Sequence, residues 1–202
     1  YTFLISGAPE NSEITVIHDG KNISVGEKFS ISTFDTDKVV ATDIAGYTWN
    51  IVVDKENETI TLIYTEAADI VNPTAVVALI NRIGGEGTDA KFKFVLSPSL
   101  NSKQEMFVIG NDDEKILIKG TTISALTTGI GWYLQNIAHI NISWNSLNEK
   151  TVSGDAYADL SSIPVPKAEE VHTSDAMYRY YLNTCAFGYS MTSWTWKRWQ
   201  QE

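Results

Sequence analysis

Alternation of apolar and polar residues dominates the first 67 positions of the chain. Short runs with this alternation are separated by turn-forming residues and cover positions 2–6, 13–18, 28–32, 39–42, 47–53 and 59–64. Successive side chains of a strand point to opposite faces, so a period of two predicts strands with one buried face. The polar stretch 54–58 between the last two runs predicts a β-hairpin. We therefore expect a small all-β sandwich or barrel over residues 1–69.

The periodicity becomes helical after residue 69. Apolar side chains recur at helical spacing in Val76, Val77, Leu79, Ile80 and Ile83, and Gly84 and Gly85 follow them. This spacing predicts a helix that ends at the two glycines. Asn72 is the expected N-cap, with Pro73 at the first helical position.

The stretch 70–166 predicts an α+β domain. Strands are expected at 91–96, 105–109, 115–119 and 139–144, and the polar loop 110–114 should join the middle pair as an antiparallel hairpin. A second helix is predicted over 124–137. Gly129 and Gly131 lower its helix propensity, and such small residues let a helix approach a sheet closely. The result is a sheet with two helices on one face.

A polar stretch with Pro164 and Pro166 follows, from residue 145 to 175. It predicts either a linker between domains or a segment that packs along the surface. The final 25 residues then read as one strand, a short loop and the opening turns of a helix. No Gly or Pro ends that helix, and its tryptophans have little core to bury them. We therefore expect residues 167–202 to be a linker and the truncated start of a (β/α)8 barrel.

The aromatic end of the chain carries a family resemblance. The run YRYYLNTCAFGYSMTSWTWKRWQQE at 178–202 resembles the segment that opens the catalytic barrel of the α-N-acetylglucosaminidases, glycoside hydrolase family 89. Residues 73–166, with GIGWYLQNIAHINISW at 129–144, resemble the small α/β domain that precedes this barrel. The two segments cover about the last two thirds of the chain. Residues 1–70 resemble nothing in the family core.

This resemblance implies a parent enzyme that removes terminal α-linked N-acetylglucosamine from glycans with retention of configuration. Such enzymes use two glutamates, whose carboxyl groups lie about 5 Å apart across the sugar. The resemblance puts both on later barrel strands, beyond residue 202, so we expect no catalytic residue in this chain. Asn183 and Cys185 match family positions that line the sugar pocket, at the barrel face where active sites are built. The resemblance also suggests a secreted, periplasmic or cell-surface protein.

Composition narrows the set of partners. The net charge of −10 and the scattered basic residues argue against nucleic acid. No apolar run of about 18 residues is present, so no transmembrane segment is expected. One cysteine excludes an internal disulfide. The histidines at 18, 139 and 172 lie far apart in sequence, and Asp112, Asp113 and Glu114 read as a solvated turn, so neither a metal nor another cofactor is expected.

A second function remains open on sequence alone, that of a free-standing glycan-binding or adhesion module. Tyr47, Trp49 and Trp144 would be its stacking residues, although each also fits a core position. An orphaned strand and helix at residues 178–202 would be unnecessary in such a module, which favours the glycosidase. We expect this tail to fold back on the α+β domain, to pair with a second copy, or to be mobile, because an uncovered strand exposes unpaired backbone groups. The helix tryptophans Trp194, Trp196 and Trp199 are expected to pack the first barrel helix.

Overall fold

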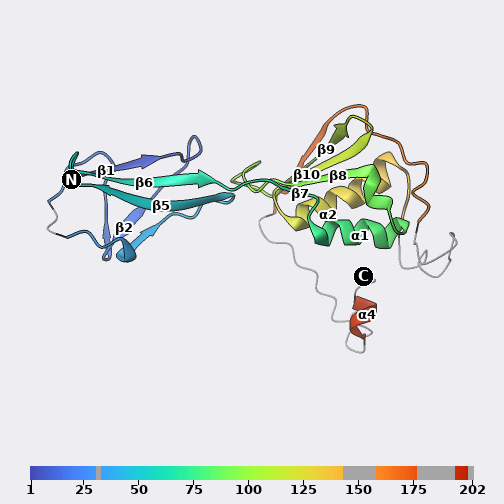
Figure 1. Cartoon of the computed structure of the whole chain (residues 1–202), viewed down its shortest axis with the longest axis horizontal. Coiled ribbons are helices and arrows are strands. Elements are labelled where there is room, and N and C mark those ends of the chain that lie inside the picture. The colour runs from blue at the N-terminus through green and yellow to red at the C-terminus, as the bar shows by residue number, and fades with distance from the viewer. Residues whose placement is uncertain (31–32, 143–157, 177–193, 200–202) are drawn as a thin grey trace.

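The computed structural model describes residues 1–30, 33–142, 158–176 and 194–199. Within these ranges the strands form two three-stranded sheets and one five-stranded sheet. The two small sheets come from the N-terminal residues, and the five-stranded sheet lies with its helices at the other end of the molecule (Figure 1). The described part of the chain is thus mostly sheet with few helices.

The N-terminal part is all β, as predicted. One sheet has the order β1-β6-β5 and the other the order β3-β2-β4. The strands are β1 (Thr2–Ser6), β2 (Val16–His18), β3 (Lys21–Asn22), β4 (Val39–Ala41), β5 (Tyr47–Asp54) and β6 (Thr59–Glu66). The predicted hairpin is confirmed, because β5 pairs antiparallel with β6. The run predicted at 28–32 forms only an isolated bridge between Thr2 and Lys28, and residues 31–32 lie outside the described ranges.

Alternation along β6 builds the core of this part. Ile60, Leu62 and Tyr64 are buried together with Phe3 and Val16 from the neighbouring strands. The Tyr64 hydroxyl donates a hydrogen bond of 2.6 Å to the carbonyl of Thr42. Burial raises the pKa of Tyr64. The tyrosine therefore stays a neutral donor that links β6 to the end of β4.

The larger sheet has the strand order β11-β9-β10-β8-β7. Its strands are β7 (Ile70–Val71), β8 (Phe92–Leu96), β9 (Met106–Asp112), β10 (Lys115–Gly120) and β11 (Glu170–Thr173). The predicted hairpin of β9 and β10 is present and antiparallel. β10 runs parallel to β8, and the two edge strands β7 and β11 pair antiparallel with their neighbours.

Two helices cover one face of this sheet, as predicted. They are α1 (Thr74–Gly84) and α2 (Ile123–Trp132), and α2 continues as the π-helical turn η3 (Tyr133–Ile137) (Figure 1). The short elements η1 (Thr36–Lys38), η2 (Thr88–Lys91) and α4 (Trp196–Trp199) complete the described structure. The core between helices and sheet is apolar and includes Ile80, Phe94, Ile109, Ile118 and Leu126, each at 0% exposure.

The start of α1 differs from the prediction. Pro73, and not Asn72, occupies the N-cap position, and no side chain caps this end. Asn72 instead has a φ of 50°. Its Oδ1 accepts a hydrogen bond of 2.9 Å from the Phe94 amide, and its own amide donates to the Phe94 carbonyl at 2.8 Å. The side chain thus extends the β7–β8 pairing, which leaves it unavailable for the helix.

The strand predicted at 139–144 is wrong over residues 139–142, which form no strand; residues 143 and 144 lie outside the described ranges. The backbone reverses at His139, where φ is 56°, and the Ile140 amide bonds back to the Leu134 carbonyl at 2.7 Å. Ile140 and Ile142 still pack against the core. The sheet takes its last strand, β11, from the stretch that was predicted to connect the domains.

Helix α2 lies close to the sheet through a glycine, as the sequence suggested. Gly129 is buried, and a Cβ at this position would lie 2.8 Å from Ile118 Cγ2. Gly131 is exposed and would meet nothing within 4 Å. Thr122 caps the helix by accepting a hydrogen bond of 2.9 Å from the Ala125 amide. Close approach therefore depends on Gly129 alone of the two predicted glycines.

Tyr133 anchors the far end of this helix. Its side chain is fully buried, and its hydroxyl donates to the Pro164 carbonyl at 2.7 Å. Burial raises the pKa of Tyr133 to about 12, so the hydroxyl keeps its proton at physiological pH. The helix end and the segment that leads to β11 are thereby tied together.

The parts of the chain that hold the two apolar cores touch through their loops. A Cβ on Gly46 would lie 2.2 Å from the Pro98 carbonyl oxygen, so the loop before β5 touches the loop after β8. Ser99 donates a hydrogen bond to the Glu66 carboxylate, and the Ala67 amide bonds to the Gly46 carbonyl at 2.8 Å. The domain boundary near residue 69 stays a prediction.

Candidate functional site

The residues predicted to contact sugar, Asn183 and Cys185, lie outside the described residues, together with the predicted barrel strand at 178–182. Of the predicted barrel helix, only the turn α4 falls within them, and Trp196 on it is 75% exposed. The search for a site therefore turns to the remainder of the described structure.

Candidate metal ligands do not gather in this part of the chain. Among the described residues, no group of three or more His, Cys, Asp and Glu side chains is placed to hold a metal ion. Asp112 forms an ion pair of 2.9 Å with Lys93 on β8, and Asp113 takes a φ of 56° in the hairpin turn. No helix in the described ranges is long and apolar enough to cross a membrane.

Two of the three residues proposed for a glycan-binding module, Tyr47 and Trp49, fall within the described ranges. Tyr47 and Trp49 are half-buried and pack against the core of the N-terminal part. Trp49 Nε1 donates a hydrogen bond of 3.4 Å to Asp43 Oδ1. Trp144 lies outside the described residues. Both described rings therefore contribute to the core of the N-terminal part.

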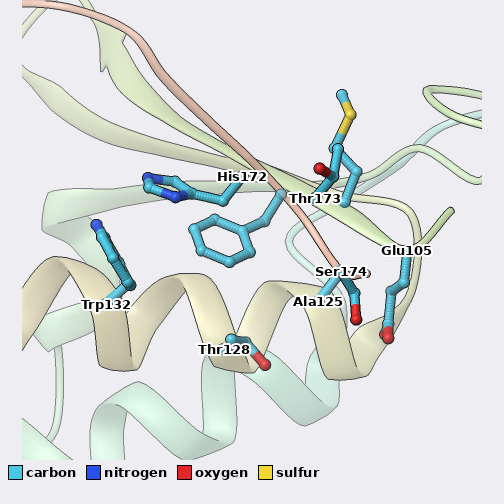
Figure 2. Close-up of a pocket in the computed structure, with 9 residues that line it drawn as sticks. Glu105, Ala125, Thr128, Trp132, His172, Thr173 and Ser174 are labelled. Carbon is cyan, nitrogen blue, oxygen red and sulfur yellow. The ribbon is translucent and has the colours of Figure 1, made fainter. Parts of the chain in front are cut away.

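A cavity of about 230 Å³ lies where α2 approaches β9 and β11. Trp132 and Thr128 line it from α2, His172 from β11 and Ser174 from the residue after that strand (Figure 2). Glu105 lines it from the residue before β9. On the helix-covered side of the sheet, α2 contacts β8, β9 and β10, and the edge strand β11 lies beyond β9. The cavity fills the space between the helix and that edge strand.

One end of the cavity is aromatic. The His172 ring stacks on Phe107 with centroids 4.8 Å apart and lies 4.3 Å from the Trp132 ring. Trp132 Nε1 donates to Glu170 Oε2 at 3.3 Å, and His172 Nε2 lies at the same distance from that oxygen. Because a carboxylate can only accept, Glu170 fixes the orientation of both rings. Trp132 remains 39% exposed, so part of its surface is open to a ligand.

The other end of the cavity is polar. Glu105 is half-buried there and accepts a hydrogen bond from the Thr122 hydroxyl. The Thr128 hydroxyl donates to the Ser124 carbonyl at 2.8 Å, and the Ser174 hydroxyl donates to the Ala176 carbonyl at 3.0 Å. Both hydroxyl hydrogens are therefore engaged, and these side chains offer only lone pairs to the cavity.

These groups suit binding better than covalent chemistry. A nucleophilic hydroxyl needs a base within hydrogen-bonding reach, and the Ser174 and Thr128 hydroxyls both donate to main-chain carbonyls. Glu105 is the one carboxylate among the residues that line the cavity. A pair of carboxyl groups facing one another across a substrate, as glycoside hydrolysis requires, is not present among these lining residues.

Sequence reasoning missed this cavity because it placed residues 145–175 in a connection. Trp132 and His172 are distant in sequence and come together only through the pairing of β11 with β9. One signal in the sequence could have indicated the strand β11. The exposed Val171 and Thr173 alternate with His172, whose side chain is half-buried, so the stretch has a weak period of two.

The comparisons with known proteins cover part of this chain. Residues 74–153 match the family described as alpha-N-acetylglucosaminidase (NAGLU) N-terminal domain. The human alpha-N-acetylglucosaminidase is 28% identical over 131 residues, which are 63% of this chain and 17% of the human protein. The chain thus spans about a sixth of the length of this relative.

Two solved structures of family 89 glycoside hydrolases are also similar to part of this chain. A family 89 glycoside hydrolase from Clostridium perfringens, in complex with 2-acetamido-1,2-dideoxynojirmycin, is similar with a TM-score of 0.52 and 25% identity, over 63% of this chain and 14% of that one. A second Clostridium perfringens structure, in complex with its substrate GlcNAc-alpha-1,4-galactose, gives the same TM-score and coverage at 24% identity. The resemblance to the α-N-acetylglucosaminidases of glycoside hydrolase family 89 is therefore confirmed, and the match to their N-terminal domain lies at residues 74–153.

Proposed function

We propose that this chain is the N-terminal, non-catalytic part of an exo-acting α-N-acetylglucosaminidase that removes terminal α-linked N-acetylglucosamine with retention. The observation that carries the proposal is the family match over residues 74–153. This range spans both helices α1 and α2 and three of the five strands of the larger sheet, β8, β9 and β10. The Clostridium perfringens relative bound to GlcNAc-alpha-1,4-galactose supports a glycan with terminal α-linked N-acetylglucosamine as the substrate.

The proposed division of labour follows from length and chemistry. A (β/α)8 barrel needs about 250 residues. The matched part of the chain corresponds to 17% of the human enzyme and to 14% of the bacterial one. We place the catalytic glutamates on later barrel strands and assign the α+β domain the task of supporting the barrel. Residues 167–202 would then connect to the barrel and begin it, and the enzyme would act outside the cytoplasm, as a secreted, periplasmic or cell-surface protein.

The first test compares this chain with its full-length parent. The parent should hydrolyse an aryl α-N-acetylglucosaminide and leave the β-anomer intact, and NMR of the first-formed sugar should show retention. The chain alone should give no turnover above the level of a mock purification, because it lacks both proposed glutamates. Turnover by the purified chain, or a parent that cleaves neither anomer, would contradict the proposal.

A second prediction concerns Asn183 in the parent enzyme. If its amide bonds to the terminal sugar, Asn183→Ala should lower kcat/KM by roughly tenfold, since a hydrogen bond is worth about 0.5 to 1.5 kcal/mol and more when a charged group takes part. Cys185→Ser, which changes only the pocket wall, should have a smaller effect. Thermal unfolding serves as the control. A full kcat/KM, or a loss explained by unfolding, would assign Asn183 a structural role.

A further inference from the structure

We propose that a second cavity, in the N-terminal all-β part, binds an oxyanion, that is, a carboxylate, sulfate or phosphate group of a ligand. This cavity has a volume of about 390 Å³ and is lined by residues 18, 19, 21–24 and 27–30. We call it the β2–β3 cavity. The family match at residues 74–153 does not include these residues, so the proposal is independent of the glycosidase function proposed above.

One wall of the β2–β3 cavity is the hairpin formed by these two strands. Its turn residues Asp19 and Gly20 have φ values of 49° and 76°, which are typical of a two-residue type I′ turn. His18 and Lys21 flank this turn and pair with each other. Side chains of directly opposed residues lie on the same face of a strand pair, so those of His18 and Lys21 share one face of the hairpin. Both residues line the cavity.

The other wall, residues 27–30, is held to β1 by the backbone. The Gly26 amide, just before this wall, donates a hydrogen bond of 2.7 Å to the Phe3 carbonyl. Lys28, within it, forms the isolated bridge with Thr2. A site whose backbone is already fixed loses less conformational entropy when it binds a ligand. The backbone therefore places one lysine on each wall before any ligand arrives.

The two lysines stand out because the N-terminal part is acidic. The first 69 residues contain four Lys, no Arg and twelve Asp or Glu. Lys21 and Lys28 nevertheless both line the cavity. Within the described residues, neither of these side chains has an ion pair or a hydrogen bond. Their ammonium groups are therefore available to an anionic ligand.

The carboxylates of the lining leave an excess of positive charge. Asp19 Oδ1 lies 4.0 Å from the Nζ of Lys38, a lysine outside the lining. Glu27 is exposed and has no ion pair in the part of the chain that the structure describes. Two unpaired ammonium groups thus face one unpaired carboxylate, and a concave surface with an excess of one charge concentrates ligands of the opposite charge.

The neutral polar side chains of the lining are hydrogen-bond donors without an acceptor. They belong to Asn22, Ser24 and Ser30. None of these three side chains makes a hydrogen bond within the described ranges, so their amide and hydroxyl hydrogens can be donated to a ligand. An ionised oxyanion only accepts hydrogen bonds, and those that it accepts are stronger than bonds between neutral groups.

The His18 ring adds a polar atom that the fold leaves without a partner. Its Nε2 is buried and has no hydrogen bond among the described residues. Buried polar atoms are hydrogen-bonded in the large majority of cases, so this nitrogen is an exception. The ring stacks on Phe34 with centroids 4.5 Å apart, which fixes its orientation. An oxyanion bound in the cavity would supply an acceptor for this nitrogen when it carries its hydrogen.

The test titrates the whole chain with sodium sulfate, sodium phosphate and sodium acetate. Ionic strength is kept constant with sodium chloride, and the backbone amide signals are followed by NMR. We expect saturable shifts, at millimolar anion, confined to residues 18–30 and their neighbours in the sheet. The anion that binds most tightly identifies the ligand group as a sulfate ester, a phosphate ester or a carboxylate. Shifts that do not saturate with any of the three anions, or that spread evenly over the chain, would overturn the proposal.

Four substitutions locate the effect. Lys21→Gln and Lys28→Gln should each weaken binding by about threefold or more, since each removes one ammonium group from the cavity. Glu27→Gln should strengthen binding, because it removes the unpaired carboxylate. Lys55→Gln is the matched control: Lys55 is exposed in the β5–β6 turn, and its loss changes the net charge equally. If Lys55→Gln weakened binding as much as the two cavity variants, the anions would respond to net charge alone and the proposed site would be wrong.

Discussion

Replacing Gly46 by alanine is expected to destabilise the protein by about 2 to 4 kcal/mol. The φ of Gly46 is 80°, a conformation that residues with a Cβ rarely adopt. The new methyl group would also lie 2.2 Å from the Pro98 carbonyl oxygen and 2.5 Å from the Ser99 nitrogen. These are backbone atoms, so the two loops must separate to make room. Urea unfolding followed by circular dichroism measures the loss.

Gly20→Ala is the control for this experiment. Gly20 has a similar φ of 76°, in the turn between β2 and β3, but a Cβ there would meet nothing within 4 Å. It should cost only about 1 to 2 kcal/mol, the conformational part alone. In Gly46→Ala the Ala67 amide, which bonds to the Gly46 carbonyl at 2.8 Å, should also exchange its hydrogen faster. Equal costs for the two variants would show that the Pro98 loop yields freely and does not hold the two parts together.

The sequence pattern correctly predicted those strands and helices that are specified by residues close together in the chain. The β5–β6 hairpin follows from alternation on both sides of a polar turn, and the β9–β10 hairpin from the same kind of signal. Helix α2 was predicted from its apolar stripe, and its N-cap Thr122 is an ordinary capping residue. In each case the residues that specify the element are neighbours in sequence, so a single sequence contains the information.

The elements that were missed depend on distant partners. The stretch 139–142 has the apolar residues expected of a strand. Its Ile140 and Ile142 do pack against the core, but the backbone there is irregular. The neighbouring position in the sheet is taken by β11, which has few apolar residues and is stabilised by pairing with β9. Asn72 was predicted to cap the helix because only its sequence neighbours were considered. Its actual partner, Phe94, lies 22 residues away.

The candidate site residues also differ in whether the sequence could predict them. Asn183 and Cys185 rest on the family resemblance and lie outside the described residues, so they stay predictions. The cavity between α2 and β11 joins residues from separate elements, and the weak period of two around His172 does not reveal that they meet. Glu170 is a clear example. As a sequence position it is one more exposed carboxylate, and only the fold shows that it orients both Trp132 and His172.

The two glycines of α2 should respond to substitution with opposite signs. Gly131→Ala is expected to stabilise the protein by up to about 1 kcal/mol, because it raises helix propensity at an exposed position with nothing within 4 Å. Gly129→Ala gains the same propensity but places its methyl group 2.8 Å from Ile118 Cγ2 and 3.3 Å from Phe107 Cδ2. Overpacking a filled core costs about 1 to 3 kcal/mol, so this variant should be destabilised.

Ile118 makes this clash hard to relieve. It is at 0% exposure and β-branched, and a side chain of that kind has few alternative rotamers. Gly129→Val, which adds two further methyl groups at the same place, should therefore cost about 3 kcal/mol or more. Chemical denaturation of the three variants gives the comparison directly. If Gly129→Ala stabilised the protein as much as Gly131→Ala does, helix α2 would be free to move away from the sheet, and close packing at Gly129 would not be what holds it there.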